Sequence, residues 1–205
     1  MAQNLFSVEL LNHFRFAAHL ASMANTTEFS LPEAIAILER APAVFDAQLR
    51  GLSDFWIRSS EGPGTWSPYD IVGHLIYAER ADWMPRIHIL LNSGESRPFD
   101  PFDRFAQLKE SKGKSLDDLL DEFAAIRQEN LVRLKAFDFK SEDLSRRGLH
   151  PSLGSVTLSQ LLATWATHDL NHLHQLARVM AGQQREAVGP WNIHLGVLKC
   201  DGHSS

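Results

Sequence analysis

The stretch from residue 157 to residue 180 constrains the fold most, because its apolar residues recur at helical spacing. They form one broad stripe made of Leu161, Leu162, Trp165, Ala166, Leu173, Leu176 and Val179. Thr157 precedes the stripe and Gln160 follows three residues later, which is the pattern of a capping box at a helix start. The sequence therefore predicts a long helix with one face buried against other helices.

The second half of this stretch contains His168, His172 and His174. His168 and His172 are four residues apart on the apolar face, whereas His174 falls on the polar side with Thr167, Asn171 and Arg178. Two inward imidazoles at this spacing form half of a metal site, because a neutral ring nitrogen is a good ligand for zinc or nickel. The same spacing also arises by chance in a chain with ten histidines.

Asp169 falls on the buried side of the same helix, where a carboxylate without a partner is costly. Two arrangements would explain it. The carboxylate would accept the second ring N–H of a metal-binding histidine, or it would have a charge partner elsewhere in the fold.

Three further helices are predicted from caps and periodicity. One starts after Ser30 and continues through Leu38, and Pro42 is expected to end it and to open a new segment. A second begins at the N-cap Ser67, is kinked at Pro85 and ends at Gly94. A third begins at Ser115 and repeats its apolar positions as far as Leu134.

The segments between these helices, residues 51–64, 96–114 and 138–155, are expected to be loops. No segment shows sustained strand alternation or a hairpin turn of the Asn-Gly type. The predicted fold class is therefore all-α, a helical bundle with four main helices.

Composition excludes several classes of function. With 25 acidic and 20 basic residues the formal charge is −5, and no concentrated basic patch for nucleic acid is present. No run of 18 apolar residues could span a membrane, and the start lacks the positive region of a secretory signal. Cys200 is the sole cysteine, so we expect no internal disulfide and a cytoplasmic location.

Residues 3–22 are predicted to form a mildly amphipathic helix, and residues 24–30 are a polar break. Met23 would serve as a start codon, so the first 22 residues are either an extension or an ordinary N-terminal helix docked on the bundle. We divide the chain into an N-terminal extension (1–30), a four-helix bundle (31–190) and a C-terminal tail (191–205).

His74 is a third histidine predicted on the apolar side of a long helix. A single histidine in such a place commonly belongs to the core. Together with His168 and His172, however, it completes a set of three imidazoles from two helices, which leaves a fourth metal position for water or substrate.

At these residues the chain resembles the DinB-like superfamily, which includes the YfiT-type proteins. The resemblance rests on GTWSPYDIVGHL from Gly64, which contains His74, and on Ser155-Val-Thr-Leu followed by HDLNHLHQL from His168. His150-Pro-Ser-Leu-Gly154 and the helix start at Ala41-Pro42 also fit, so that the similar region covers about residues 31–181. It implies an up-down-down-up four-helix bundle, commonly a homodimer, with nickel or zinc at His74, His168 and His172.

The resemblance implies several possible activities. Relatives include thiol S-transferases that use bacillithiol or mycothiol, a maleylpyruvate isomerase that uses mycothiol, and proteins labelled as metal-dependent hydrolases. A metal with an open position lowers the pKa of a bound thiol or water, so that thiolate gives a transferase and hydroxide a hydrolase. We expect a small-molecule substrate, including a low-molecular-weight thiol, with neither nucleic acid nor membrane as partner.

Three charged residues are weaker candidates for this chemistry. Glu79 and Asp169 are candidate catalytic residues that would support a ligand or transfer a proton, although each is also compatible with a structural carboxylate. Arg127 would hold an anionic substrate or pair with Glu129 or Asp121 at the surface. The rival hypothesis is a bundle without catalytic activity, in which a metal links two helices or is absent.

Overall fold

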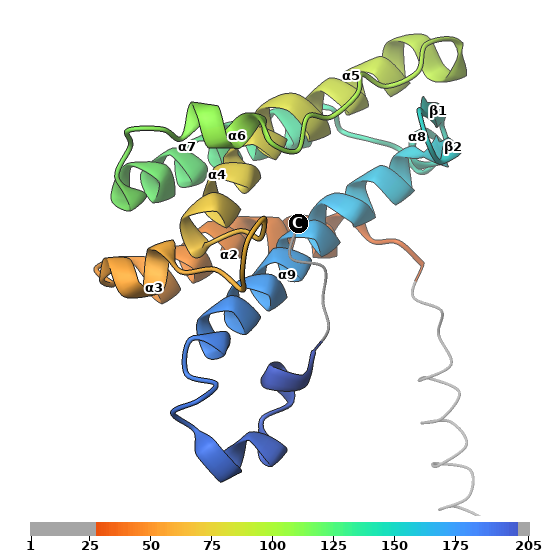
Figure 1. Cartoon of the computed structure of the whole chain (residues 1–205). Helices are drawn as coiled ribbons and strands as arrows, with labels where there is room; N and C mark the ends of the chain where they lie inside the picture. Colours follow the sequence, from red (N-terminus) through yellow and green to blue (C-terminus); the bar gives the residue numbers. More distant parts are fainter. Residues whose placement is uncertain (1–27, 201–205) are drawn as a thin grey trace, which may run out of the picture. The chain divides into compact units, whose positions relative to one another are not determined.

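The computed structural model describes residues 28–200, and four long helical segments dominate this part of the chain (Figure 1). They are α2 (Leu31–Leu49), the run of α4 (Pro68–Ala78), η1 (Glu79–Trp83) and α5 (Met84–Ser93), then α7 (Leu116–Ala136), and α9 (Leu158–Gly182). The predicted all-α four-helix bundle is confirmed. The helix predicted for residues 3–22 lies outside the described residues, and the three-part division of the chain stays a prediction.

Shorter elements connect the long helices. They are α3 (Asp54–Arg58), η2 (Gly94–Ser96), α6 (Ala106–Glu110), α8 (Ser141–Leu144), β1 (Arg147–His150), β2 (Gly154–Thr157), η3 (Gly189–His194) and η4 (Gly196–Lys199). None of the helices between residues 28 and 200 has the length and apolar character needed to cross a membrane.

Capping boxes fix the starts of three helices at the N-cap residues that the sequence predicts. Ser67 and Asp70 cap α4 reciprocally, and Ser115 with Asp118 does the same for α7. Thr157 accepts a hydrogen bond from the backbone N–H of Gln160 at the start of α9. Each box satisfies N–H groups that a helix start leaves unpaired, so it sets which residues of the following turns face the core.

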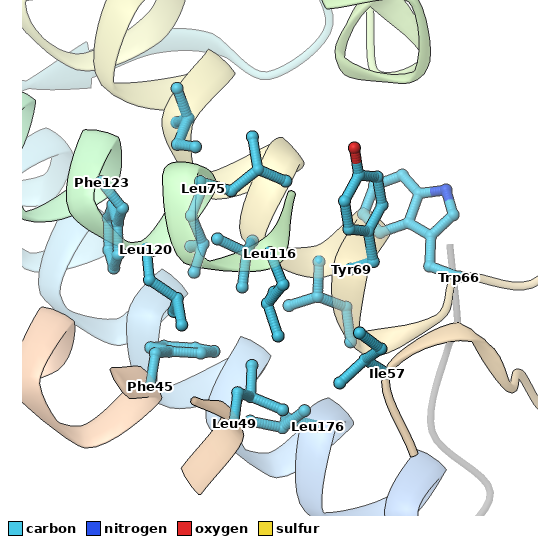
Figure 2. Packing of buried hydrophobic residues seen from close by; sticks show 14 of the residues in the cluster. Phe45, Leu49, Ile57, Trp66, Tyr69, Leu75, Leu116, Leu120, Phe123 and Leu176 are labelled. Carbon is cyan, nitrogen blue, oxygen red and sulfur yellow. The ribbon is translucent and has the colours of Figure 1, made fainter. Parts of the chain in front are cut away.

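The core is formed where α2, α4, α7 and α9 meet (Figure 2). Phe45 of α2 meets Phe123 of α7 edge to face, with ring centroids 5.9 Å apart. Leu49, Leu75, Leu120 and Leu176 complete the contact between the four helices and are all buried. Burial of each such side chain stabilises the fold by about 1.5–3 kcal/mol.

The prediction that Pro42 ends the first helix is wrong, because α2 runs from Leu31 to Leu49 without a break. A proline inside a helix cannot donate to the carbonyl four residues earlier, which here is Leu38. Arg127 of α7 donates to that carbonyl oxygen at 2.9 Å. A partner from another helix thus replaces the missing hydrogen bond, so the helix can continue.

The bend expected at Pro85 takes the form of a π-helical turn just before it, η1 from Glu79 to Trp83. Pro85 then lies in the first turn of α5, where its missing N–H costs little. Because a π-turn adds a residue to the helix, it changes which side chains face inward after His74. Glu79, Asp82 and Trp83 are all buried.

The expectation of loop structure from 138 to 155 is also wrong in part. Strands β1 and β2 form an antiparallel hairpin, with Arg147 opposite Thr157, and Phe99 donates its backbone N–H to Leu149 at 2.9 Å. A side chain at Gly148 would meet the Phe99 ring at 2.8 Å, so glycine is needed for this packing. The strands are too short to show alternation, and their stability comes from this tertiary contact.

Candidate metal centre

The structure brings His74 of α4 together with His168 and His172 of α9, and we call these residues the three-histidine cluster. Their candidate ligand nitrogens all lie within 4.8 Å of one another. His168 Nε2 is 3.1 Å from His74 Nε2 and 3.1 Å from His172 Nε2. The helical spacing on α9 and the inward face of α4 were predicted from the sequence, and the packing of the two helices supplies the convergence.

This geometry suits a divalent metal better than it suits hydrogen bonds between the rings. His168 Nε2 carries either a proton or a lone pair, so it forms a full hydrogen bond with at most one of its two neighbours. A tetrahedral zinc ion about 2.0–2.1 Å from each nitrogen would separate them by about 3.3 Å, close to the observed spacing. One cation could accept a lone pair from each ring.

Burial keeps the three rings in the form that binds metal. It lowers the pKa of His74 to about 3, with further lowering by the charges of His172 and Arg104. It lowers the pKa of His172 to about 4, against a raising effect of the hydrogen bond to Gln175. The pKa of His168 is also well below its usual range because of burial. Neutral imidazole is the form that coordinates a metal, so the cluster is ready for one at neutral pH.

Gln175 orients one of the rings. Its Oε1 lies 2.7 Å from His172 Nδ1, and an amide oxygen can only accept, so Nδ1 carries the proton and Nε2 presents its lone pair to the cluster. Partners of this kind fix the tautomer of a metal-binding histidine. The sequence reasoning gave Gln175 no role, although its position three residues after His172 places it on the same helical face.

Aromatic rings enclose the cluster. The ring centroid of Trp66 is 4.6 Å from that of His74 and 6.2 Å from that of His172. Trp83 meets His168 edge to face at 5.1 Å, and Phe102 meets His74 in the same way at 5.7 Å. These contacts hold the imidazoles in place and exclude water from their sides. Sequence reasoning did not single out these residues as part of the site.

Asp169 does not support a histidine; it has a charge partner, which is the other arrangement considered from the sequence. Arg127 of α7 binds it with two hydrogen bonds, Nη1 to Oδ2 at 2.6 Å and Nη2 to Oδ1 at 3.1 Å. Nη2 of the same guanidinium also donates to Glu79 Oε1 at 2.8 Å. The surface pairing of Arg127 with Glu129 or Asp121 is therefore a wrong prediction, because this side chain is buried between two carboxylates.

Two neutral groups complete the pairing of Glu79. The Trp165 indole N–H donates to its Oε1 at 2.8 Å, and the Asn130 amide donates to its Oε2 and to its backbone carbonyl oxygen, both at 2.9 Å. We call Glu79, Arg127 and Asp169, with Asn130 and Trp165, the charge network. It links the bundle helices, because Arg127 also reaches the backbone of α2.

The charge network is polar, and its two carboxylates are paired within the chain, whereas Arg127 Nε has no hydrogen-bond partner among the described residues. Burial raises the pKa of Asp169 to about 6, and the charge of Arg127 opposes this. Burial alone would lower the pKa of Arg127, but Glu79 and Asp169 raise it above its usual range. Arg127 is therefore held between two carboxylates and is not positioned to bind a substrate. Catalytic roles for Glu79 and Asp169 stay predictions.

His174 is exposed on the outer face of α9, as its place in the helical pattern predicts. It offers a matched control for the cluster, because it lies two residues from His172 on the same helix.

Comparison with known proteins places these features in a family. A family profile described as the DinB superfamily matches residues 37–176. A comparison with curated protein sequences found no significant match.

Two solved structures share the fold. One is YfiT from Bacillus subtilis, described as a probable metal-dependent hydrolase with an unusual four-helix bundle topology. It superposes with a TM-score of 0.64 at 20% identity, over 80% of this chain and 91% of YfiT. The other is a variant of a mycothiol-dependent maleylpyruvate isomerase, with a TM-score of 0.50 at 14% identity, over 73% of this chain and 68% of that one.

The family profile spans most of the chain, including both helices that carry the three-histidine cluster. The superposition on YfiT covers 80% of this chain. As the resemblance of its histidine motifs implies, this chain belongs to the DinB superfamily.

Proposed function

We propose that this protein is a metal-dependent enzyme for small molecules, of the thiol S-transferase type, with His74, His168 and His172 as the metal ligands. The convergence of three neutral imidazoles carries the proposal, with His168 Nε2 3.1 Å from the Nε2 atoms of both His74 and His172. Within residues 28–200 this cluster has three members, so a four-coordinate zinc or nickel ion would keep one position for a substrate.

A divalent metal in this place would lower the pKa of a bound thiol or water and so supply a nucleophile at neutral pH. The chain's own residues prepare the site for it. Gln175 keeps the proton of His172 on Nδ1, and Trp66 and Trp83 keep bulk water from the rings. The charge network ties η1, the direct continuation of α4, and α7 to α9, which supports the separation of His74 from the other two ligands.

Thiol chemistry is favoured by one structural relative, which is described as mycothiol-dependent. The shared fold supports the idea that this bundle accommodates a low-molecular-weight thiol beside its metal. A homodimer in the cytoplasm belongs to the same proposal.

Hydrolysis is the second candidate function, because YfiT is described as a probable metal-dependent hydrolase. The same three ligands would then activate water. A bundle in which the metal only links α4 and α9 is the third possibility, and it requires a fourth protein ligand or a filled substrate position.

Absorption spectra of the cobalt- or nickel-substituted protein distinguish these functions. A transferase site should show a changed spectrum when a thiol is added, and His172→Ala should abolish the change while His174→Ala preserves it. No response to thiols, together with metal-dependent cleavage of ester or amide substrates, would favour a hydrolase. No response and no cleavage would contradict both enzyme hypotheses.

A further inference from the structure

The connection between η2 and α6 contributes two side chains to the surroundings of the three-histidine cluster. The Phe102 ring meets the edge of His74 and also contacts the ring of Tyr77, with centroids 5.2 Å apart. Two residues further on, the guanidinium carbon of Arg104 lies 5.9 Å from the centre of the Trp66 ring. Trp66 is the residue that packs against both His74 and His172. One segment therefore places a cation beside the aromatic wall of the site.

No carboxylate in the described part of the fold pairs with Arg104. Between residues 28 and 200 Arg104 forms no ion pair, whereas Arg97 in the same segment binds both carboxylate oxygens of Asp100 at 3.1 Å. The neighbouring carboxylate, Asp103, accepts the backbone N–H of Phe105 at 3.0 Å. Arg104 is exposed, so a ligand can reach it.

The position of this cation matters for the site electrically. Its guanidinium carbon lies 5.9 Å from the centre of the Trp66 ring, which is itself 4.6 Å from the His74 ring, so the cation lies next to the cluster. Three neutral imidazoles do not reduce the charge of a divalent metal, and one thiolate would cancel half of it. With Arg104 nearby, the site has positive charge left for a second anionic group on the same ligand.

We propose that Arg104 is a substrate-recognition residue that binds a carboxylate of the small molecule reacting at the metal. This rests on the proposed function. Guanidinium matches a carboxylate with two parallel hydrogen bonds, and cation–π contacts with the Trp66 and Phe105 rings, each 5.9 Å away, limit the orientations that the guanidinium can adopt. The thiol substrate class is thereby narrowed to thiols that carry a carboxylate.

The test compares two thiols of nearly equal size, 3-mercaptopropionate and its uncharged methyl ester. Their dissociation constants are measured from the absorption spectrum of the cobalt-substituted full chain. In the wild type the acid should bind more tightly relative to the ester than it does in Arg104→Met, by about tenfold. Arg104→Lys should retain part of this preference, because it keeps the charge but not the fork.

Arg97→Met is the matched control, since it removes a positive charge from the same segment. It should leave the ratio of the two dissociation constants unchanged. Equal ratios in the wild type and Arg104→Met, or the same loss in Arg97→Met, would overturn the role of Arg104 and leave the proposed function standing. If neither thiol changes the spectrum of the wild type, the proposed function fails, and the role of Arg104 fails with it.

Discussion

Two buried polar clusters connect the continuous α4–η1 segment to α9, and they differ in how completely their groups are paired. In the charge network, one guanidinium lies between two carboxylates, and an indole and an amide donate the remaining hydrogen bonds to Glu79. In the three-histidine cluster, ring nitrogens face one another, and the central one has two neighbours but a single proton or lone pair.

This difference separates a structural device from a binding site. In the charge network, donors of the chain itself pair both carboxylates, so these need no ligand, and among its five side chains Arg127 Nε is the one buried polar atom without a partner in the described part of the chain. The histidines present electron pairs to a common point, and a cation satisfies them better than they satisfy one another. Both clusters are buried, and both contain groups with shifted pKa values. Neither burial nor a shifted pKa therefore distinguishes the binding site from the structural network.

Removal of the guanidinium should produce the largest effect on folding. Arg127→Met leaves two buried carboxylates and the Leu38 carbonyl without their donor, and we expect it to lower the free energy of unfolding by about 3–5 kcal/mol. Urea denaturation followed by circular dichroism measures this. Lys135→Met, at an exposed position of the same helix outside the charge network, removes only a surface ion pair with Glu39 and should change stability by less than about 1 kcal/mol. A loss below 1 kcal/mol in Arg127→Met would show that the network is not a structural unit.

Replacement of a histidine of the three-histidine cluster should have a large effect on metal binding and a small effect on folding. His74→Ala, His168→Ala or His172→Ala should each lose most bound metal, because two ligands make a poor site, while the metal-free protein stays folded. The loss of metal affinity should exceed the 10–100-fold that is typical when a residue hydrogen-bonded to a metal ligand is replaced. Metal analysis of purified variants decides, with His174→Ala as the control that retains full metal content. Equal metal in wild type and His168→Ala would exclude the site.

Variants of Gln175 test whether the hydrogen-bond partner of a metal-binding histidine affects the affinity for metal. Gln175→Leu should weaken metal binding by about tenfold, because His172 is then free to adopt the other tautomer. Gln175→Glu keeps an acceptor and should largely preserve affinity. Competition with a chromophoric chelator measures both. An unchanged metal affinity in Gln175→Leu would show that Gln175 contributes to packing and not to metal binding.

The smallest effect concerns pH. With ordinary pKa values, the sequence predicts that protons displace the metal below about pH 6. Burial moves the pKa of His74 to about 3 and that of His172 to about 4, so the folded protein should retain metal to near pH 4. Dialysis at stepwise lower pH, followed by metal analysis, measures the release. A midpoint near pH 6 would contradict the burial of these rings.

The same shifts have a consequence for the metal-free protein. The unfolded chain takes up protons on these histidines as the pH falls below about 6.5, while the folded chain does not. The contribution of these histidines to stability should therefore be largest above pH 6.5 and fall toward pH 4, whereas Asp169, with its pKa raised to about 6, contributes in the opposite direction. Melting temperatures in the presence of a chelator report the slope, and His74→Gln should flatten it.

Local sequence was sufficient for the helix starts and for the candidate ligands. Caps at Ser67, Ser115 and Thr157 depend on contacts over three residues, and the pairing of His168 with His172 depends on helical spacing. Such short-range interactions are visible in any sequence. The all-α class follows from them, and the predicted inward face of α4 placed His74 on the correct side.

What only the tertiary structure decided depends on partners distant in the chain. Pro42 permits a continuous α2 because Arg127, from another helix, donates to the carbonyl that the proline leaves unpaired. Arg127 is buried because Glu79 and Asp169 reach it from two further helices, and the hairpin at residues 147–157 forms where Phe99 covers it. Each is a pairing of buried polar or apolar groups across helices, and the free energy of such pairs appears only when the bundle is packed.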